Sequence, residues 1–205
     1  MLALSVSTAV FAKSHHDKES DSDDTPGSFN SPALKDAVIV IIRHAEKPAS
    51  GYELSAAGEA RAQAYAGYFQ HFTLDGQPVK FNYIFAAADS KESQRPRLTI
   101  TPTSLAIGIT IDSRFKDKDF QELANEIRSK PHGQAILISW HHGEIPSLMR
   151  SLGANPAAVI PKAKWPEDVF GWLIELRYNA DGRLIETRRI KEKLIPDDSN
   201  KHSEK

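Results

Sequence analysis

The sequence contains no cysteine, which excludes disulfide bonds, thiolate nucleophiles and cysteine-based zinc sites. The chain also has almost no net charge, because 26 Lys and Arg residues are balanced by 27 Asp and Glu residues, for a formal net charge of -1. The chain therefore has no global positive field to attract nucleic acid or an anionic membrane, and any anion-binding site must be local. The apolar stretch at residues 1–12 is too short to span a bilayer.

The first residues have the composition of a targeting segment. The stretch "MLALSVSTAVFA", residues 1–12, is small and apolar and ends like a cleavage site, although it lacks a positively charged start. We therefore expect the remnant of a secretory signal peptide and a periplasmic or secreted protein; the alternative is a cytoplasmic protein with a frayed N-terminus. Residues 13–34 are polar and predict a disordered linker, and residues 196–205 predict a disordered tail. One folded domain is expected over residues 35–195.

Buried strands and amphipathic helices alternate along this domain. Apolar strands are predicted at 37–42, 83–87 and 134–140. Helices are predicted over 55–72 with Ser55 as N-cap, over 99–107 with Pro102 in the first turn, along the stripe Phe120, Leu123 and Ile127, and from near Pro146 to Gly153. This order predicts an α/β fold in which helices cover both faces of a mostly parallel sheet, as a three-layer α/β/α sandwich.

The last two strands are expected to form a hairpin at one edge of the sheet. Residues 170–178, "FGWLIELRY", alternate strictly, so that five apolar side chains share one face while Glu175 and Arg177 lie on the other. The sequence "NADG" then turns the chain into "RLIETRRI".

Cationic and imidazole side chains follow each of the three predicted parallel strands. They are Arg43 and His44 after the first, Ser90 and Arg95 after the second, and His141 and His142 after the third. Ligands of such sheets bind beyond the carboxyl ends of the strands, so these residues are expected to converge. Guanidinium groups match two phosphate oxygens in a planar fork, and the set therefore predicts a site for a phosphoryl dianion.

Five segments in order make the sequence similar to the histidine phosphatase superfamily, also called phosphoglycerate mutase-like. They are "IIRHAEKP", "YELSAAGEARAQAYAGYF", "DSKESQRPRLTITPTSLA", "AILISWHHGEIPSLMRSLGA" and "KWPEDVFGWLIELRYNADGRL". The resemblance covers residues 37 to 190 and implies the phosphoglycerate mutase-like fold.

The resemblance also implies a role for each matching residue. His44 is expected to be the nucleophile, while Arg43, Arg95 and one of the paired histidines hold the phosphoryl oxygens, with no metal and no cofactor. Crowding by the two arginines disfavours the protonated form of His44, as a nucleophilic imidazole requires. An acidic residue should protonate the leaving oxygen, for which Glu144 is our first choice and Asp119 the alternative.

Several assignments have competitors. His141 and His142 both fit the second histidine, and Trp140 and the His-Gly dipeptide favour His142. The spacing to Thr99 and Pro102 favours Arg95 over Arg97, and Arg61 is expected to be a structural helix residue. Ser90, His141 and Lys47 are further candidates for substrate binding, although Lys47 could equally be a solvated loop residue.

The leading hypothesis is a metal-independent phosphomonoester hydrolase that acts through a phosphohistidine on a small-molecule phosphoester or a phosphoprotein. One alternative is a phosphomutase, whose enclosing insertions this compact chain has little room for. Another is a phosphate-binding relative with impaired catalysis. A metalloenzyme built on His141 and His142 is disfavoured because no third ligand lies at suitable spacing.

Overall fold

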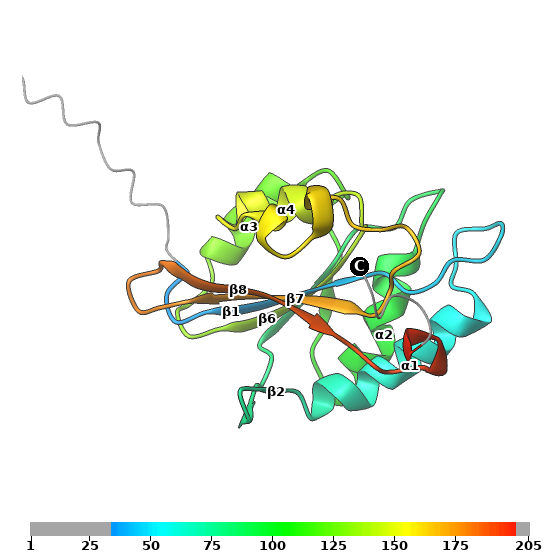
Figure 1. Ribbon diagram of the computed structural model, residues 1–205, viewed down its shortest axis with the longest axis horizontal. Helices are drawn as coiled ribbons and strands as arrows, with labels where there is room; N and C mark the ends of the chain where they lie inside the picture. Colours follow the sequence, from blue (N-terminus) through cyan, green and yellow to red (C-terminus); the bar gives the residue numbers. More distant parts are fainter. Residues whose placement is uncertain (1–33, 200–205) are drawn as a thin grey trace, which may run out of the picture. The chain divides into compact units, whose positions relative to one another are not determined.

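The computed structural model describes residues 34–199, which contain a central sheet of six strands in the order β5-β4-β6-β1-β7-β8 (Figure 1). The strands are β1 (Val38–Arg43), β4 (Tyr83–Ala86), β5 (Ile111–Asp112), β6 (Ala135–Trp140), β7 (Trp172–Tyr178) and β8 (Leu184–Lys191). Strands β1, β4, β5 and β6 run parallel, whereas β7 and β8 are antiparallel. The mostly parallel sheet with a hairpin at one edge is therefore confirmed.

Helices cover both faces of this sheet. Helices α3 (Phe120–Arg128) and α4 (Ile145–Ser151) lie on one face, and α1 (Ala56–Gln70) and α2 (Arg95–Ile107) lie on the other (Figure 1). Ser55 caps α1 as predicted, because its hydroxyl accepts a hydrogen bond from the Gly58 amide. The three-layer α/β/α sandwich is confirmed.

Two apolar clusters pack against opposite faces of the sheet. One cluster contains the buried apolar side chains of α3 and α4 together with Trp140 and Trp165. The other contains the aromatic side chains of α1 together with Val40 and Ile42. Alternate residues of β1 therefore enter different clusters, and five of its six residues are buried. Burial on both faces is why the predicted parallel strands consist of unbroken apolar runs.

Short elements complete the described chain. Strands β2 (Thr73–Leu74) and β3 (Gln77–Pro78) form a small hairpin, which the sequence did not predict. Three 3₁₀ turns follow α4, namely η1 (Pro156–Ala158), η2 (Pro161–Ala163) and η3 (Pro196–Ser199). Turn η3 lies in the segment predicted as a tail, where Asp198 binds Arg61 of α1.

The predicted start of α2 is wrong. The helix begins at Arg95 instead of Thr99, so Pro96 lies in its first turn and Pro102 lies inside it. The Ser93 hydroxyl accepts a hydrogen bond from the Arg95 amide, which starts the helix earlier. This shift matters for function because it places Arg95 on the first turn of α2.

The face of β7 that carries Glu175 and Arg177 is buried at its centre. Glu175 is fully buried, and its carboxylate binds Arg177 and Arg188. Both arginines also bind Asp75 in the turn between β2 and β3, so the small hairpin covers this face. Pairing with two guanidinium groups compensates for the burial of the carboxylate.

The predictions for residues 1–12 and for most of the linker concern segments outside the described residues. Within residues 34–199, no helix is long and apolar enough to cross a membrane.

Candidate active site

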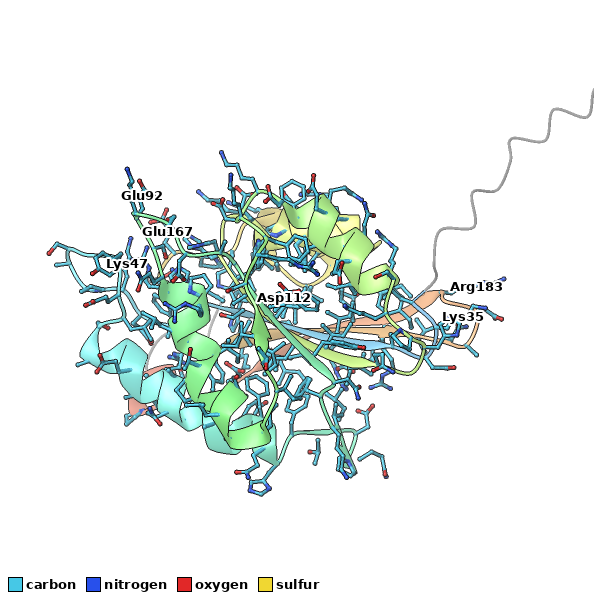
Figure 2. All side chains as sticks on the ribbon, turned by 180° about the vertical axis from the view of Figure 1, so that it is seen from behind. Lys35, Lys47, Glu92, Asp112, Glu167 and Arg183 are labelled. Carbon is cyan, nitrogen blue, oxygen red and sulfur yellow. The ribbon has the colours of Figure 1, made fainter. Side chains whose placement is uncertain are left out.

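The cationic residues predicted to converge lie at the carboxyl ends of β1, β4 and β6. Figure 2 shows Lys47 and Glu167 at this end of the sheet, whereas Lys35 and Arg183 lie at the opposite end. His44 follows β1, Arg95 opens α2 after β4, and His141 and His142 follow β6. The His44 ring lies 5.2 Å from that of His141 and 6.2 Å from that of His142, measured between ring centroids.

His44 is buried and has one defined tautomer. Its Nδ1 lies 2.7 Å from the Ala45 carbonyl oxygen, and a carbonyl can only accept a hydrogen bond. Nδ1 must therefore carry the proton, and in the neutral ring Nε2 keeps its lone pair. Thr99 fixes the preceding peptide group, because its hydroxyl accepts from the Ala45 amide and donates to the Arg95 carbonyl.

The surroundings of His44 favour the neutral imidazole. Burial lowers its pKa well below the usual value, and the nearby positive charges of Arg43 and Arg95 lower it further. The hydrogen bond to Ala45 opposes these effects without overcoming them. His44 thus has the tautomer and the charge state that a nitrogen nucleophile requires at neutral pH.

Arg43 is buried next to this ring and is held by the loop before β7. Its Nη1 donates hydrogen bonds to the carbonyl oxygens of Pro166, Glu167 and Val169, at 2.7 to 3.1 Å. Its guanidinium carbon lies 3.8 Å from the centre of the Phe170 ring. Burial lowers the pKa of Arg43 to about 10, so it stays cationic at neutral pH.

Arg95 presents a second guanidinium group to the same centre. Its Nη1 donates to the Gly51 carbonyl oxygen, whereas its buried Nε has no hydrogen-bond partner within the described chain. The Nε of Arg43 is also buried and unpartnered there. Buried N–H groups without partners are costly, about 1–3 kcal/mol each, and such groups call for an explanation.

The paired histidines are both half-buried beside His44. Burial is the main reason that the pKa of His142 falls to about 4, and it also lowers the pKa of His141. The Nδ1 of His142 is buried without a partner among residues 34–199, like the two arginine Nε atoms. The choice of His142 over His141 as the second histidine stays a prediction.

The acid candidates from the sequence lie at the rim. Glu144 directly precedes α4, but its side chain makes no capping hydrogen bond. Within the described chain, its carboxylate does not interact with His44 or the arginines. Asp119 precedes α3, and its carboxylate accepts from the Lys116 amide.

Four other carboxylates act on the site residues: Glu46, Glu167 and Asp168 act on Arg43, and Asp117 acts on His141. Asp117 and Glu167 are the two that also act on a histidine, and neither was singled out from the sequence. Asp117 is half-buried and its charge acts on His141, while Glu167 acts on Arg43 and His142. The loop that carries Asp117 is fixed because the Trp140 indole N–H donates to the Asp117 carbonyl oxygen.

Four other residues were candidates from the sequence, and the structure shows the contacts of each. Ser90 is exposed, and its hydroxyl accepts from two amides of its own turn. Lys47 is exposed, and its charge acts on His142. Arg97 is held by Asp89 in a bidentate pair, and Arg61 is buried between Glu46 and Asp198. These pairs agree with the choice of Arg95 over Arg97 and with a structural Arg61.

The loop that follows β1, which carries His44 and Glu46, depends on close packing by α1. A Cβ atom on Gly58 would lie 2.4 Å from the Glu46 carbonyl oxygen, so only glycine lets the helix approach this closely. That carbonyl accepts a hydrogen bond from the Ser55 amide. Within residues 34–199, no group of three His, Asp or Glu side chains is arranged to hold a metal ion.

Comparison with known proteins gives a structural likeness only. No family model and no curated protein sequence matches the chain. A phosphoglycerate mutase from Plasmodium falciparum matches with a TM-score of 0.51 and 16% identity, over 78% of this chain and 94% of that one. A phosphoserine phosphatase mutant from Entamoeba histolytica matches with a TM-score of 0.49 and 11% identity, over 74% and 96%. The likeness to the mutase confirms the predicted fold.

Proposed function

Because the chain has the phosphoglycerate mutase-like fold, we propose that it is a metal-independent phosphomonoester hydrolase that acts through a phosphohistidine on His44. The observation that carries this proposal is a set of three buried nitrogen atoms without a hydrogen-bond partner among residues 34–199, the Nε atoms of Arg43 and Arg95 and Nδ1 of His142. They belong to side chains around a neutral imidazole with a free Nε2. A bound phosphoryl group would supply the oxygen atoms that all three lack.

The reaction takes place in two displacements. His44 Nε2 attacks phosphorus, a P–N bond forms, and the P–O bond to the leaving group breaks. The leaving oxygen departs as an alcohol with a proton from an acidic side chain. Water then attacks the phosphohistidine, the same side chain accepts a proton, and inorganic phosphate leaves. The fixed guanidinium groups stabilise the charge on the transferring group throughout.

Burial of His142 has a consequence for binding. With a pKa of about 4, its ring is neutral at pH 7. A phosphoryl dianion nearby favours the protonated form, so substrate binding should draw a proton onto this ring. The site would thereby adapt its charge to the substrate while Arg43 and Arg95 supply the permanent positive charge.

We assign the acid role to Asp117. Its charge acts on His141, whose ring lies 5.2 Å from that of His44, and its loop is tied to the end of β6 through Trp140. Glu144 and Asp119 have no comparable interaction among residues 34–199.

Replacing Asp117 by asparagine should slow phosphoenzyme formation from an alkyl phosphate by roughly 100-fold. With 4-nitrophenyl phosphate, whose leaving group needs no proton, the rate should change little. Rapid-quench measurements with both substrates check this. Glu144→Gln and Asp119→Asn are the matched variants, and selective loss with the alkyl substrate in either of them would move the acid role to that residue.

The proposed function itself is tested by mixing the protein with a ³²P-labelled phosphoester and quenching in base. We expect release of inorganic phosphate and a labelled protein that is stable in base and labile in acid, as a phosphohistidine is. Return of the label to an isomeric position of the alcohol would indicate a mutase instead. Tight phosphate binding without any turnover would indicate an impaired relative.

The composition of residues 1–12 supports export, and hence substrates outside the cytoplasm.

A further inference from the structure

A cavity opens beside His142 of the proposed phosphoryl site. It lies between α4 and the segment that follows η2, and its lining includes His142, Ser147, Arg150, Lys164, Trp165 and Glu167. His142 therefore belongs to both places, since its ring also lies 6.2 Å from that of the nucleophile. A phosphoester bound at His44 would direct its leaving group toward one of the spaces that adjoin this ring.

The cavity is more cationic than the transfer of one phosphoryl group requires. Arg150 and Lys164 are exposed, and the side chain of neither forms a hydrogen bond or ion pair within the part that the structure describes. The lining has one carboxylate, that of Glu167, whose charge acts on Arg43 and His142. Two cations thus face one anion, which leaves the cavity a net positive charge for a ligand.

The wall that carries Lys164 is fixed relative to the phosphoryl site. Arg43 binds three carbonyl oxygens of residues 166–169, and the buried indole of Trp165 donates to the carbonyl oxygen of Val169. Lys162 and Ala163 just before it have φ angles of 53° and 50°, a left-handed conformation that costs non-glycine residues energy. Such a conformation persists only where the surroundings impose it, so Lys164 projects from a rigid frame.

The opposite wall is the exposed face of α4. Ser147 and Arg150 are three residues apart and so lie on one side of this helix, and its start is fixed by the buried Ile145 and Pro146. The distance between the phosphoryl site and the two cations is therefore set by rigid elements. A ligand that spans them needs a second anionic group at a defined distance from the reacting phosphorus.

We propose that this cavity is a specificity subsite for the leaving group, in which Arg150 and Lys164 bind a carboxylate or a second phosphate carried by a small phosphoester. The proposal rests on the proposed phosphatase function, because it places the phosphoryl group at His44. It predicts that acidic phosphoesters are better substrates than neutral ones of the same shape.

The test compares propyl phosphate with 3-phosphonooxypropanoate, which has a carboxylate in place of the terminal methyl group. For the wild-type protein, kcat/KM should be about tenfold higher for the acidic ester, because hydrogen bonds to charged groups are strong. Arg150→Gln and Lys164→Gln should each reduce this ratio, and the double variant should bring it close to one. Propane-1,3-diyl bisphosphate tests a phosphate in the same way and shows which anion the subsite prefers.

The control is Arg183→Gln, which removes the same charge at the opposite end of the sheet (Figure 2) and should leave the ratio unchanged. The proposal is overturned if neither acidic ester is preferred, or if the preference survives in the double variant. Equal losses for acidic and neutral esters would also overturn it, since they would show an effect on the reaction itself.

Failure of the proposed function has a different signature, namely no phosphate release from any of the esters. In that event the subsite is tested by calorimetric titration, which compares the affinity of the same proteins for propyl phosphate and for 3-phosphonooxypropanoate. Tighter binding of the acidic ester that is lost in the double variant supports the subsite, and equal binding refutes it.

Discussion

Replacing His44 by alanine is expected to lower kcat on 4-nitrophenyl phosphate by roughly 10⁴-fold or more, because the atom that accepts the phosphoryl group is removed. Nothing else at the site can take over this role. The ring of His141 is centred 5.2 Å away, so its nitrogen atoms do not occupy the place of His44 Nε2. Arg43 and Arg95 carry no lone pair that could attack phosphorus.

His71→Ala is the matched control, because this histidine is exposed at the end of α1 and should leave kcat unchanged. The labelled phosphoenzyme should disappear in His44→Ala and persist in His71→Ala. Added imidazole should restore part of the lost turnover by occupying the space of the missing ring. If His44→Ala kept the wild-type rate, the site would hydrolyse phosphoesters by direct attack of water, and the covalent mechanism would be abandoned.

The parts of the site that the sequence predicted are side chains at the ends of buried strands. The apolar run of β1 ends at Arg43, and the all-buried run of β6 ends just before His141. Parallel strands place their carboxyl ends at one edge of the sheet, so topology alone brings Arg43, His44 and the paired histidines together. No knowledge of side-chain contacts was needed for this step.

The parts that the sequence missed depend on backbone carbonyls and loops. Arg43 is held by three carbonyl oxygens of residues 166–169, and every residue type has such a group, so no pattern of letters marks it. Asp117 lies in a loop whose position depends on one indole N–H from β6. Its neighbours in sequence are charged as well, so no local pattern distinguishes the carboxylate that acts on His141.

Secondary structure shows the same limit. The start of α2 was misplaced because Pro96 and the Ser93 hydroxyl, rather than apolar spacing, begin the helix. Alternation in β7 placed Glu175 on the face opposite the apolar residues, but it could not reveal the distant turn that covers this face. In both places a contact made by a neighbouring segment overrode a local pattern.

The buried cluster behind the loop that follows β1 leads to the second large expected effect. Arg61 is 1% exposed, and its guanidinium group lies 2.8 Å from the Glu46 carboxylate and 2.6 Å from that of Asp198. Glu46 follows His44 by two residues, and Asp198 belongs to η3, so one side chain joins α1, the loop that follows β1 and the C-terminal turn. Burial raises the pKa of the neighbouring Glu192 to about 8, so little further negative charge is tolerated there at neutral pH.

Arg61→Met should therefore lower the free energy of unfolding by about 3–5 kcal/mol, since it leaves two carboxylates in a buried place without their cation. Urea-induced unfolding at pH 7 measures the loss. Arg97→Met is the matched control: its pair with Asp89 has the same bidentate geometry but is about one third exposed, so the loss should stay within about 1 kcal/mol. Changing Glu46 to Gln and Asp198 to Asn in the Arg61→Met background should restore part of the stability, because it removes the uncompensated charges. Equal losses in Arg61→Met and Arg97→Met would show that burial does not set the strength of this cluster.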